Sequence, residues 1–288
     1  MRHFIIIDIE SAVTDPAAHQ RYLAMERFVP KPEGSGRRGR DLRDDPLLTP
    51  RWVFQTIVTA VAMLCVEHED GNIDVVNMVT LSAPEHDERS IVKELLALMA
   101  SLPAETELVS YGGVWHDTPV LTAAALRHGL TLPHAWRWLA FGGDGRVQHL
   151  DLFRLLTGNA KMKLAHLSEF AAMLDLPAKI TQPAWAAARL VADADFDAVQ
   201  EMCEVDVITT CLLLACWKKL VDDKAQVGVA HDRILRRVEQ FRGYRTYSAI
   251  LAAWRKDRFA KQFATAANDI EALAPWLTVE SAPLPLAA

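Results

Sequence analysis

A short apolar run closed by two carboxylates decides the fold: Phe4-Ile5-Ile6-Ile7-Asp8-Ile9-Glu10. Four consecutive apolar residues, three of them β-branched, are typical of a buried strand. Asp8 and Glu10 are two positions apart, so on a strand their side chains point to the same side. Such carboxylates repel one another and lose solvation, a penalty that a divalent cation would remove. Alone, this pair does not separate a metal site from a structural role.

The rest of the chain predicts an α/β fold of 288 residues. Residues 53–66 and 73–81 are rich in β-branched residues and flank Asp70-Gly71, so we expect a hairpin. Antiparallel strands therefore come first and parallel ones after. Further strands are predicted at 107–111 and 147–150, helices at 90–101, 117–129, 164–174 and 197–220, and a long loop at 15–51.

Two more carboxylates follow in positions where a charged side chain is unusual. Asp117 comes after Gly112-Gly113 at a strand-to-helix turn, and Asp206 lies in a mostly apolar helical stretch. A charge on the apolar side of a helix requires a partner. Together Asp8, Glu10, Asp117 and Asp206 could hold two metal ions roughly 4 Å apart, an arrangement that suits in-line attack on phosphodiesters.

In order and spacing, these residues resemble the DEDD-type 3′–5′ exonucleases of ribonuclease-H-like fold. The likeness is greatest to the predicted exonuclease family related to the proofreading domain of family B DNA polymerases, and it runs from residue 1 to about 220. It implies a ribonuclease-H-like mixed sheet flanked by helices in an exonuclease domain at 1–220, followed by a basic helical C-terminal extension at 221–288. The stretches that carry it are Ile7–Glu10, Ser110–Leu121, His149–Leu152, Lys163–Phe170 and Met202–Val207.

The resemblance also implies an activity and a site. Two divalent cations, Mg²⁺ or Mn²⁺, would support hydrolysis of DNA or RNA from the 3′ end. Asp8, Glu10 and Asp206 would hold the first, and Asp8 with Asp117, the latter through water, the second. Asp151 is not part of the family's acidic quartet, and we interpret it as a helix cap or a support for the ligands.

Three departures from the family pattern bear on the rate. Tyr111 and His116 stand where the family has Asn and Phe, and Met202 stands where it has a water-orienting Tyr. Glu201 occupies the position at which a related branch has His. Methionine cannot relay a proton, which leaves Glu201 and His116 as candidates for that task. The alternative is a catalytically weakened nucleic-acid-binding module that kept the fold; a purely structural protein would not need four converging carboxylates.

Charge favours a nucleic-acid partner, with single-stranded DNA or a 3′ end as the expected form. The net charge is −6, but residues 231–261 carry +6, and Tyr244, Tyr247 and Trp254 are interleaved with the basic residues there. A solvated or packed helix face is the competing interpretation. Candidate phosphate contacts are Lys161, Lys163, Arg37, Arg38, Arg40 and Arg43.

Composition excludes other classes. A hydrophobic fraction of 51% and a charged fraction of 24% are typical of a globular protein and argue against disorder. No apolar run approaches the roughly 18 residues of a membrane span, so we expect no membrane association and a cytoplasmic location. The four cysteines form no C-x-x-C pair and are expected to be reduced thiols.

Overall fold

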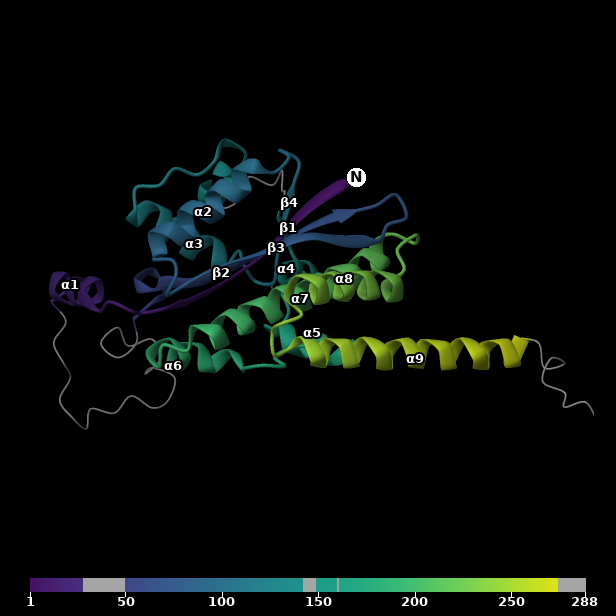
Figure 1. Cartoon of the computed structure of the whole chain (residues 1–288). Coiled ribbons are helices and arrows are strands. Elements are labelled where there is room, and N and C mark those ends of the chain that lie inside the picture. The colour runs from purple at the N-terminus through teal and green to yellow at the C-terminus, as the bar shows by residue number, and fades with distance from the viewer. Residues whose placement is uncertain (28–49, 142–148, 160, 274–288) are drawn as a thin grey trace, which may run out of the picture.

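One five-stranded mixed sheet forms the centre of the structure, a computed structural model that describes residues 1–27, 50–141, 149–159 and 161–273 (Figure 1). The strand order is β3-β2-β1-β4-β5. Strand β1 pairs antiparallel with β2, which pairs antiparallel with β3, whereas β4 is parallel to β1 and β5 to β4. The strands are β1 (Arg2–Ala12), β2 (Thr56–Glu67), β3 (Ile73–Ser82), β4 (Glu107–Ser110) and β5 (His149–Asp151). This is the predicted ribonuclease-H-like sheet, antiparallel first and parallel after.

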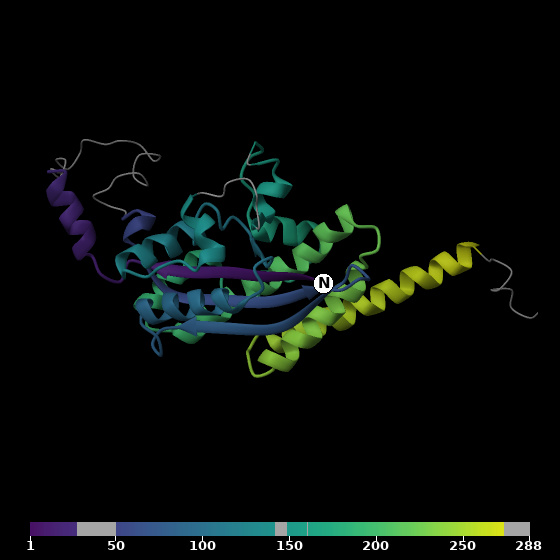
Figure 2. The ribbon, with the colours of Figure 1, turned by 90° about the horizontal axis from the view of Figure 1, so that it is seen from above.

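Helices cover both faces of this sheet, as the figures show (Figures 1 and 2). One face carries α2 (Glu88–Ser101), α3 (Asp117–Arg127) and the 3₁₀ segment η2 (His134–Phe141); the other carries α7 (Phe196–Val221) and α8 (Val227–Arg242). The remaining helical segments are α1 (Ala17–Met25), η1 (Trp52–Phe54), α4 (Leu152–Leu156), α5 (Leu167–Met173), η3 (Ala184–Ala186), α6 (Ala187–Ala192) and α9 (Ser248–Leu273).

The central strand β1 divides its residues between the two faces. Ile5, Ile7 and Ile9 belong to the core under α2 and α3, whereas Phe4 and Ile6 belong to the core under α7. Because side chains alternate along a strand, Asp8 and Glu10 continue the row of Phe4 and Ile6 and face α7. A run that is buried on both faces explains why the sequence lacks polar alternation there.

The predicted long loop at 15–51 is wrong in its first part, where α1 forms. Asp15 accepts a hydrogen bond from the Ala17 amide at 2.8 Å, and the helix buries only His19, whose ring lies 5.1 Å from that of Phe54. The ring of Tyr22 on the same helix also lies 5.5 Å from that of Phe54. A helix with so little buried surface leaves no apolar periodicity in the sequence. Arg37, Arg38, Arg40 and Arg43 lie outside the described residues.

The basic C-terminal segment is tied to the body of the molecule. Arg233 and Arg237 form ion pairs with Asp70 and Asp74 at the β2–β3 hairpin, at 3.2 and 3.5 Å. Ala230, Ile234, Leu235, Val238, Tyr247 and Leu251 belong to the same core as α7. Much of the +6 charge is therefore compensated by acids of the chain itself, and the domain boundary at 220 stays a prediction. Beyond these contacts, the last turns of α9 extend past the other elements in both views (Figures 1 and 2).

Glu204 is the residue through which α7 holds this segment. It is fully buried and accepts hydrogen bonds from Arg242 Nε at 3.1 Å, Arg245 Nη2 at 3.0 Å and the Tyr247 hydroxyl at 2.7 Å. For Tyr247 the structure supports the competing interpretation of a packed helix face, because the side chain is 0% exposed. The four cysteines are free thiols, as expected, and none of the helices in the described ranges is long and apolar enough to cross a membrane.

We predict that Tyr247→Phe lowers the free energy of unfolding by about 1.5–3 kcal/mol, because a buried carboxylate loses a hydrogen bond. Tyr244→Phe is the matched control: Tyr244 is 75% exposed, so its loss should stay within about 0.5 kcal/mol. Urea unfolding followed by circular dichroism measures both. Equal stabilities of the two variants would show that the Tyr247 hydroxyl contributes nothing to the clamp around Glu204.

Candidate active site

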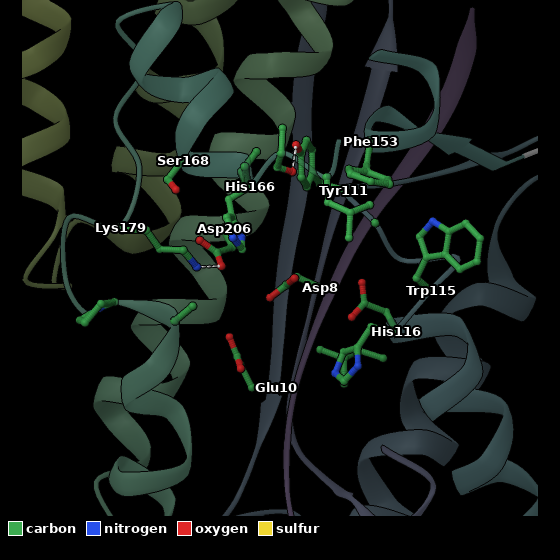
Figure 3. Close-up of a pocket in the computed structure, with 18 residues that line it drawn as sticks. Asp8, Glu10, Tyr111, Trp115, His116, Phe153, His166, Ser168, Lys179 and Asp206 are labelled. Carbon is green, nitrogen blue, oxygen red and sulfur yellow. Dashed lines mark hydrogen bonds and ion pairs between the residues drawn. The ribbon is translucent and has the colours of Figure 1, made fainter. Parts of the chain in front are cut away.

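Three carboxylates from two elements converge where β1 passes under α7 (Figure 3). One carboxylate oxygen each from Asp8, Glu10 and Asp206 lie within 4.8 Å of one another. Asp8 and Glu10 reach this point because they share one face of β1, and Asp206 because it lies on the inner face of α7. Convergence of these three side chains was predicted from the sequence, and the structure brings them together.

Burial and like charge disturb the ionisation of this acidic cluster, by which we mean Asp8, Glu10 and Asp206. Burial, with a smaller contribution from Asp206, raises the pKa of Asp8 to about 7. Burial and then Asp8 raise the pKa of Glu10 well above its ordinary value. Asp206 Oδ1 is buried and has no hydrogen-bond partner among the described residues. Crowded oxygen donors with one orphaned oxygen fit a hard divalent cation such as Mg²⁺ or Mn²⁺.

Asp117 lines the same cavity but lies outside the group of three. It is the first residue of α3 and is only 8% exposed. Burial, followed by the charge of Asp8, raises its pKa well above the ordinary value. The structure therefore places all four predicted acids around one cavity, with three of them in ligand-to-ligand distance.

The turn that carries Asp117 depends on two glycines. Gly112 has φ +77°, a backbone conformation that residues with a side chain rarely adopt. A Cβ on Gly113 would lie 2.5 Å from Ser110 Oγ, so no side chain fits there. The turn can thus approach the end of β4 closely enough to bring the start of α3 to the cavity.

Asp151 fastens this turn from the neighbouring strand. Its two carboxylate oxygens accept hydrogen bonds from the amides of Gly112 and Val114, each at 3.0 Å. It also caps α4 by accepting from the Arg154 amide at 3.2 Å. Of the two interpretations of Asp151, the helix cap is confirmed. The same side chain also holds the turn that leads to Asp117, and its role as a support for metal ligands stays a prediction.

The cavity has a volume of about 1030 Å³ and an apolar wall beside the acids. Tyr111, Trp115 and Phe153 form this wall on one side of Asp8 in Figure 3, and Lys179 lies on the other. Trp115 is 61% exposed, so its ring is accessible from solvent. The Tyr111 hydroxyl donates to the Ala165 carbonyl at 2.8 Å, which fixes its ring in the wall.

Two side chains at the acidic cluster escaped the sequence analysis. Lys179 Nζ forms an ion pair and a hydrogen bond with Asp206 Oδ2. The Cys203 thiol donates to Asp8 Oδ2 at 3.2 Å, one turn from Asp206 on α7. A lysine in a turn after Leu176-Pro177-Ala178 has no periodicity or motif, and a buried cysteine resembles any core residue, so neither carries a sequence signal.

Glu201 and His116, the two candidates for the role of the family tyrosine, differ in their position relative to the cavity. Glu201 accepts hydrogen bonds from the Thr246 amide, at 2.8 Å, and from its hydroxyl, away from the cavity. His116 lines the cavity, 3.4 Å from Ser11 Oγ, and burial lowers its pKa. Met202 is 1% exposed and is not among the described residues that line the cavity. Of these two candidates, His116 lines the described cavity and Glu201 does not.

Lys161 and Lys163, the predicted phosphate contacts, are both exposed and do not belong to the described cavity lining. The next residue, Leu164, is 70% exposed and does line the cavity. The two lysines therefore lie near its rim, and their role stays a prediction.

Comparison with solved structures finds partial likenesses. The family B DNA polymerase of Pyrobaculum calidifontis is 16% identical, with a TM-score of 0.47 over 83% of this chain and 29% of that one. E. coli exonuclease I in complex with a dT13 oligonucleotide is 10% identical, with a TM-score of 0.42 over 76% of this chain and 41% of that one. This chain thus spans less than half the length of either protein. No curated protein matches.

A family model settles the relationship. The model of a predicted 3′–5′ exonuclease related to the exonuclease domain of PolB matches residues 50–226. That range contains Asp117 and Asp206 and lies after Asp8 and Glu10. Because the match spans more than half of the chain, the protein belongs to the family of predicted 3′–5′ exonucleases related to the exonuclease domain of PolB.

Proposed function

We propose that this protein is a divalent-metal-dependent 3′–5′ exonuclease that hydrolyses phosphodiesters at the 3′ end of a single nucleic-acid strand. One observation carries the proposal: Asp8, Glu10 and Asp206 converge within 4.8 Å in a large cavity of a chain from an exonuclease-related family. Carboxylates crowded in this way repel one another, and one ammonium group does not balance three of them, which is why the cluster supports a metal site over a structural one.

The donor set suggests how two cations, Mg²⁺ or Mn²⁺, would be shared. Asp8, Glu10 and Asp206 would hold the first, and Asp8 with Asp117 the second. Bound there, the cations would neutralise phosphate charge and lower the pKa of water. Asp151 and the glycine turn keep Asp117 in place for this role, and Cys203 orients the Asp8 carboxylate.

The cavity walls suit a single strand. Trp115, Tyr111 and Phe153 present aromatic surface beside the acids, and bases stack on such surfaces without regard to sequence. Bases of a duplex are already stacked and paired, so an end would have to separate before it used this wall. Lys161 and Lys163 at the rim would contact the backbone phosphates that follow.

His116 takes the proton-handling role that the family gives to tyrosine. It lies at the cavity wall directly before Asp117, and its imidazole can accept and release a proton. The competing function is the nucleic-acid-binding module with weakened catalysis, which the buried Met202 at the tyrosine position favours. Hydrolysis assays separate the two.

The first prediction concerns the metal. Isothermal titration calorimetry with Mn²⁺ should detect binding, and Asp8→Asn should weaken it at least tenfold because a ligand charge is lost. Asp193→Asn, which changes an exposed carboxylate away from the cavity, should leave it unchanged. Melting temperatures exclude unfolding, since removing one of three like charges should not destabilise the chain. Undiminished binding by Asp8→Asn would contradict the site.

The second prediction concerns the direction in which the strand is hydrolysed. A 5′-labelled single strand should give a ladder of shortening products, and a 3′-labelled strand should release labelled mononucleotide at once. Asp206→Asn should lower the rate by about 10²-fold or more, because charge stabilisation by metal is worth several kcal/mol. DNA and RNA strands are compared in parallel, with chelator as control. Internal cleavage would contradict an exonuclease, and binding without hydrolysis would favour the binding module.

The third prediction concerns the proton. His116→Ala should lower the rate constant by about 10²-fold while strand affinity stays within twofold, as expected for a group acting in proton transfer. Glu201→Gln is the matched control and should leave the rate within twofold, because Glu201 points to Thr246. If Glu201→Gln is slow and His116→Ala is fast, the assignment is reversed.

A further inference from the structure

Lys179 is the cationic side chain that the structure pairs directly with the acidic cluster. Its Nζ contacts Asp206 Oδ2, and its charge also acts on Asp8 and Glu10, whose pKa values it lowers against the effect of burial. The side chain lines the cavity and is 23% exposed, so it lies between the protein and solvent. Figure 3 shows it reaching toward Asp206 from the side opposite the aromatic wall.

The backbone around Lys179 is held for this contact. Lys179 has φ +51°, a left-handed conformation that is uncommon for residues with a side chain. Two residues earlier, the Pro177 carbonyl accepts a hydrogen bond at 2.8 Å from Thr209 Oγ1. Thr209 lies on α7 three residues after Asp206, so the loop is fastened to the same part of the helix that presents Asp206.

A lysine at this place has two opposite consequences for a cation site. In the metal-free chain it offsets the repulsion among three carboxylates. When a divalent cation binds to the same carboxylates, the ammonium becomes a like charge at short range and opposes it, whether it stays or moves aside.

We propose that Lys179 is the internal cation of the acidic cluster, stabilising it without metal and making every divalent cation bind against its charge. The inference rests on the proposed metal site for its second half only. Lys179 thus keeps the cluster assembled before metal binds, and its positive charge lowers the affinity of the cluster for divalent cations.

The test uses the full chain with Lys179→Met, which keeps length and removes charge, and Lys179→Arg, which keeps charge. Lys93→Met on α2 is the matched control, since Lys93 is exposed on the opposite face of the sheet. In EDTA, Lys179→Met should melt about 2–4 °C lower than the wild type, while the other two variants should not. With Mn²⁺, calorimetry should show binding about tenfold tighter in Lys179→Met and within threefold of wild type in the other two.

Lys179→Gln replaces Lys179→Met if the latter fails to fold. Weaker Mn²⁺ binding by the uncharged variant would overturn the proposal, because Lys179 would then serve to orient Asp206 as a ligand. An unchanged melting temperature in EDTA would overturn it as well. If no variant binds Mn²⁺, the proposed metal site has failed, and the EDTA melting comparison alone decides whether Lys179 neutralises the cluster.

Discussion

Mutual repulsion among closely spaced carboxylates is the constraint on which the rest of this structure depends. Asp8 and Glu10 on β1 and Asp206 on α7 would separate if either element could move, because their charges crowd within 4.8 Å. The strand cannot move, since β1 is hydrogen-bonded on both sides within the sheet. The helix is held by a core that runs along its inner face. Rigidity on both sides keeps the acids together.

Two acidic residues on α7 differ in how many hydrogen-bond partners their carboxylates have. Glu204 and Asp206 are two residues apart and therefore point about 200° apart around the axis. Glu204 is satisfied by Arg242, Arg245, Tyr247 and Thr80 and has no capacity left for a ligand. Asp206 has Lys179 on one oxygen and, within the described part of the chain, no hydrogen-bond partner on the other. Glu204, whose oxygens all have hydrogen-bond partners, is structural, and Asp206, which has one oxygen without a partner in the described structure, faces the cavity.

The C-terminal segment contacts α7 through the first of these acids. For its positive charge the sequence left two interpretations open, nucleic-acid binding and a solvated or packed helix face. Several of its arginines form ion pairs with Glu204, Asp70 and Asp74. The segment closes over Glu204 and so contacts α7 two residues before Asp206. Part of this basic stretch therefore stabilises the fold of the chain itself.

Local sequence pattern alone determined the strands, the hairpin, the main helices and the convergence of Asp8 and Glu10. The hydrophobic periods of two residues for strands and 3.6 for helices, and the turn residues between them, can be recognised from residues that are close in sequence. Motif order added Asp117 and Asp206. Only the tertiary structure decided that Lys179 and Cys203 contact the acids, that Glu201 faces Thr246, and that Tyr247 is buried. Each of these contacts depends on which face of a helix or strand packs against a segment that is distant in sequence, and local sequence patterns do not predict such long-range contacts.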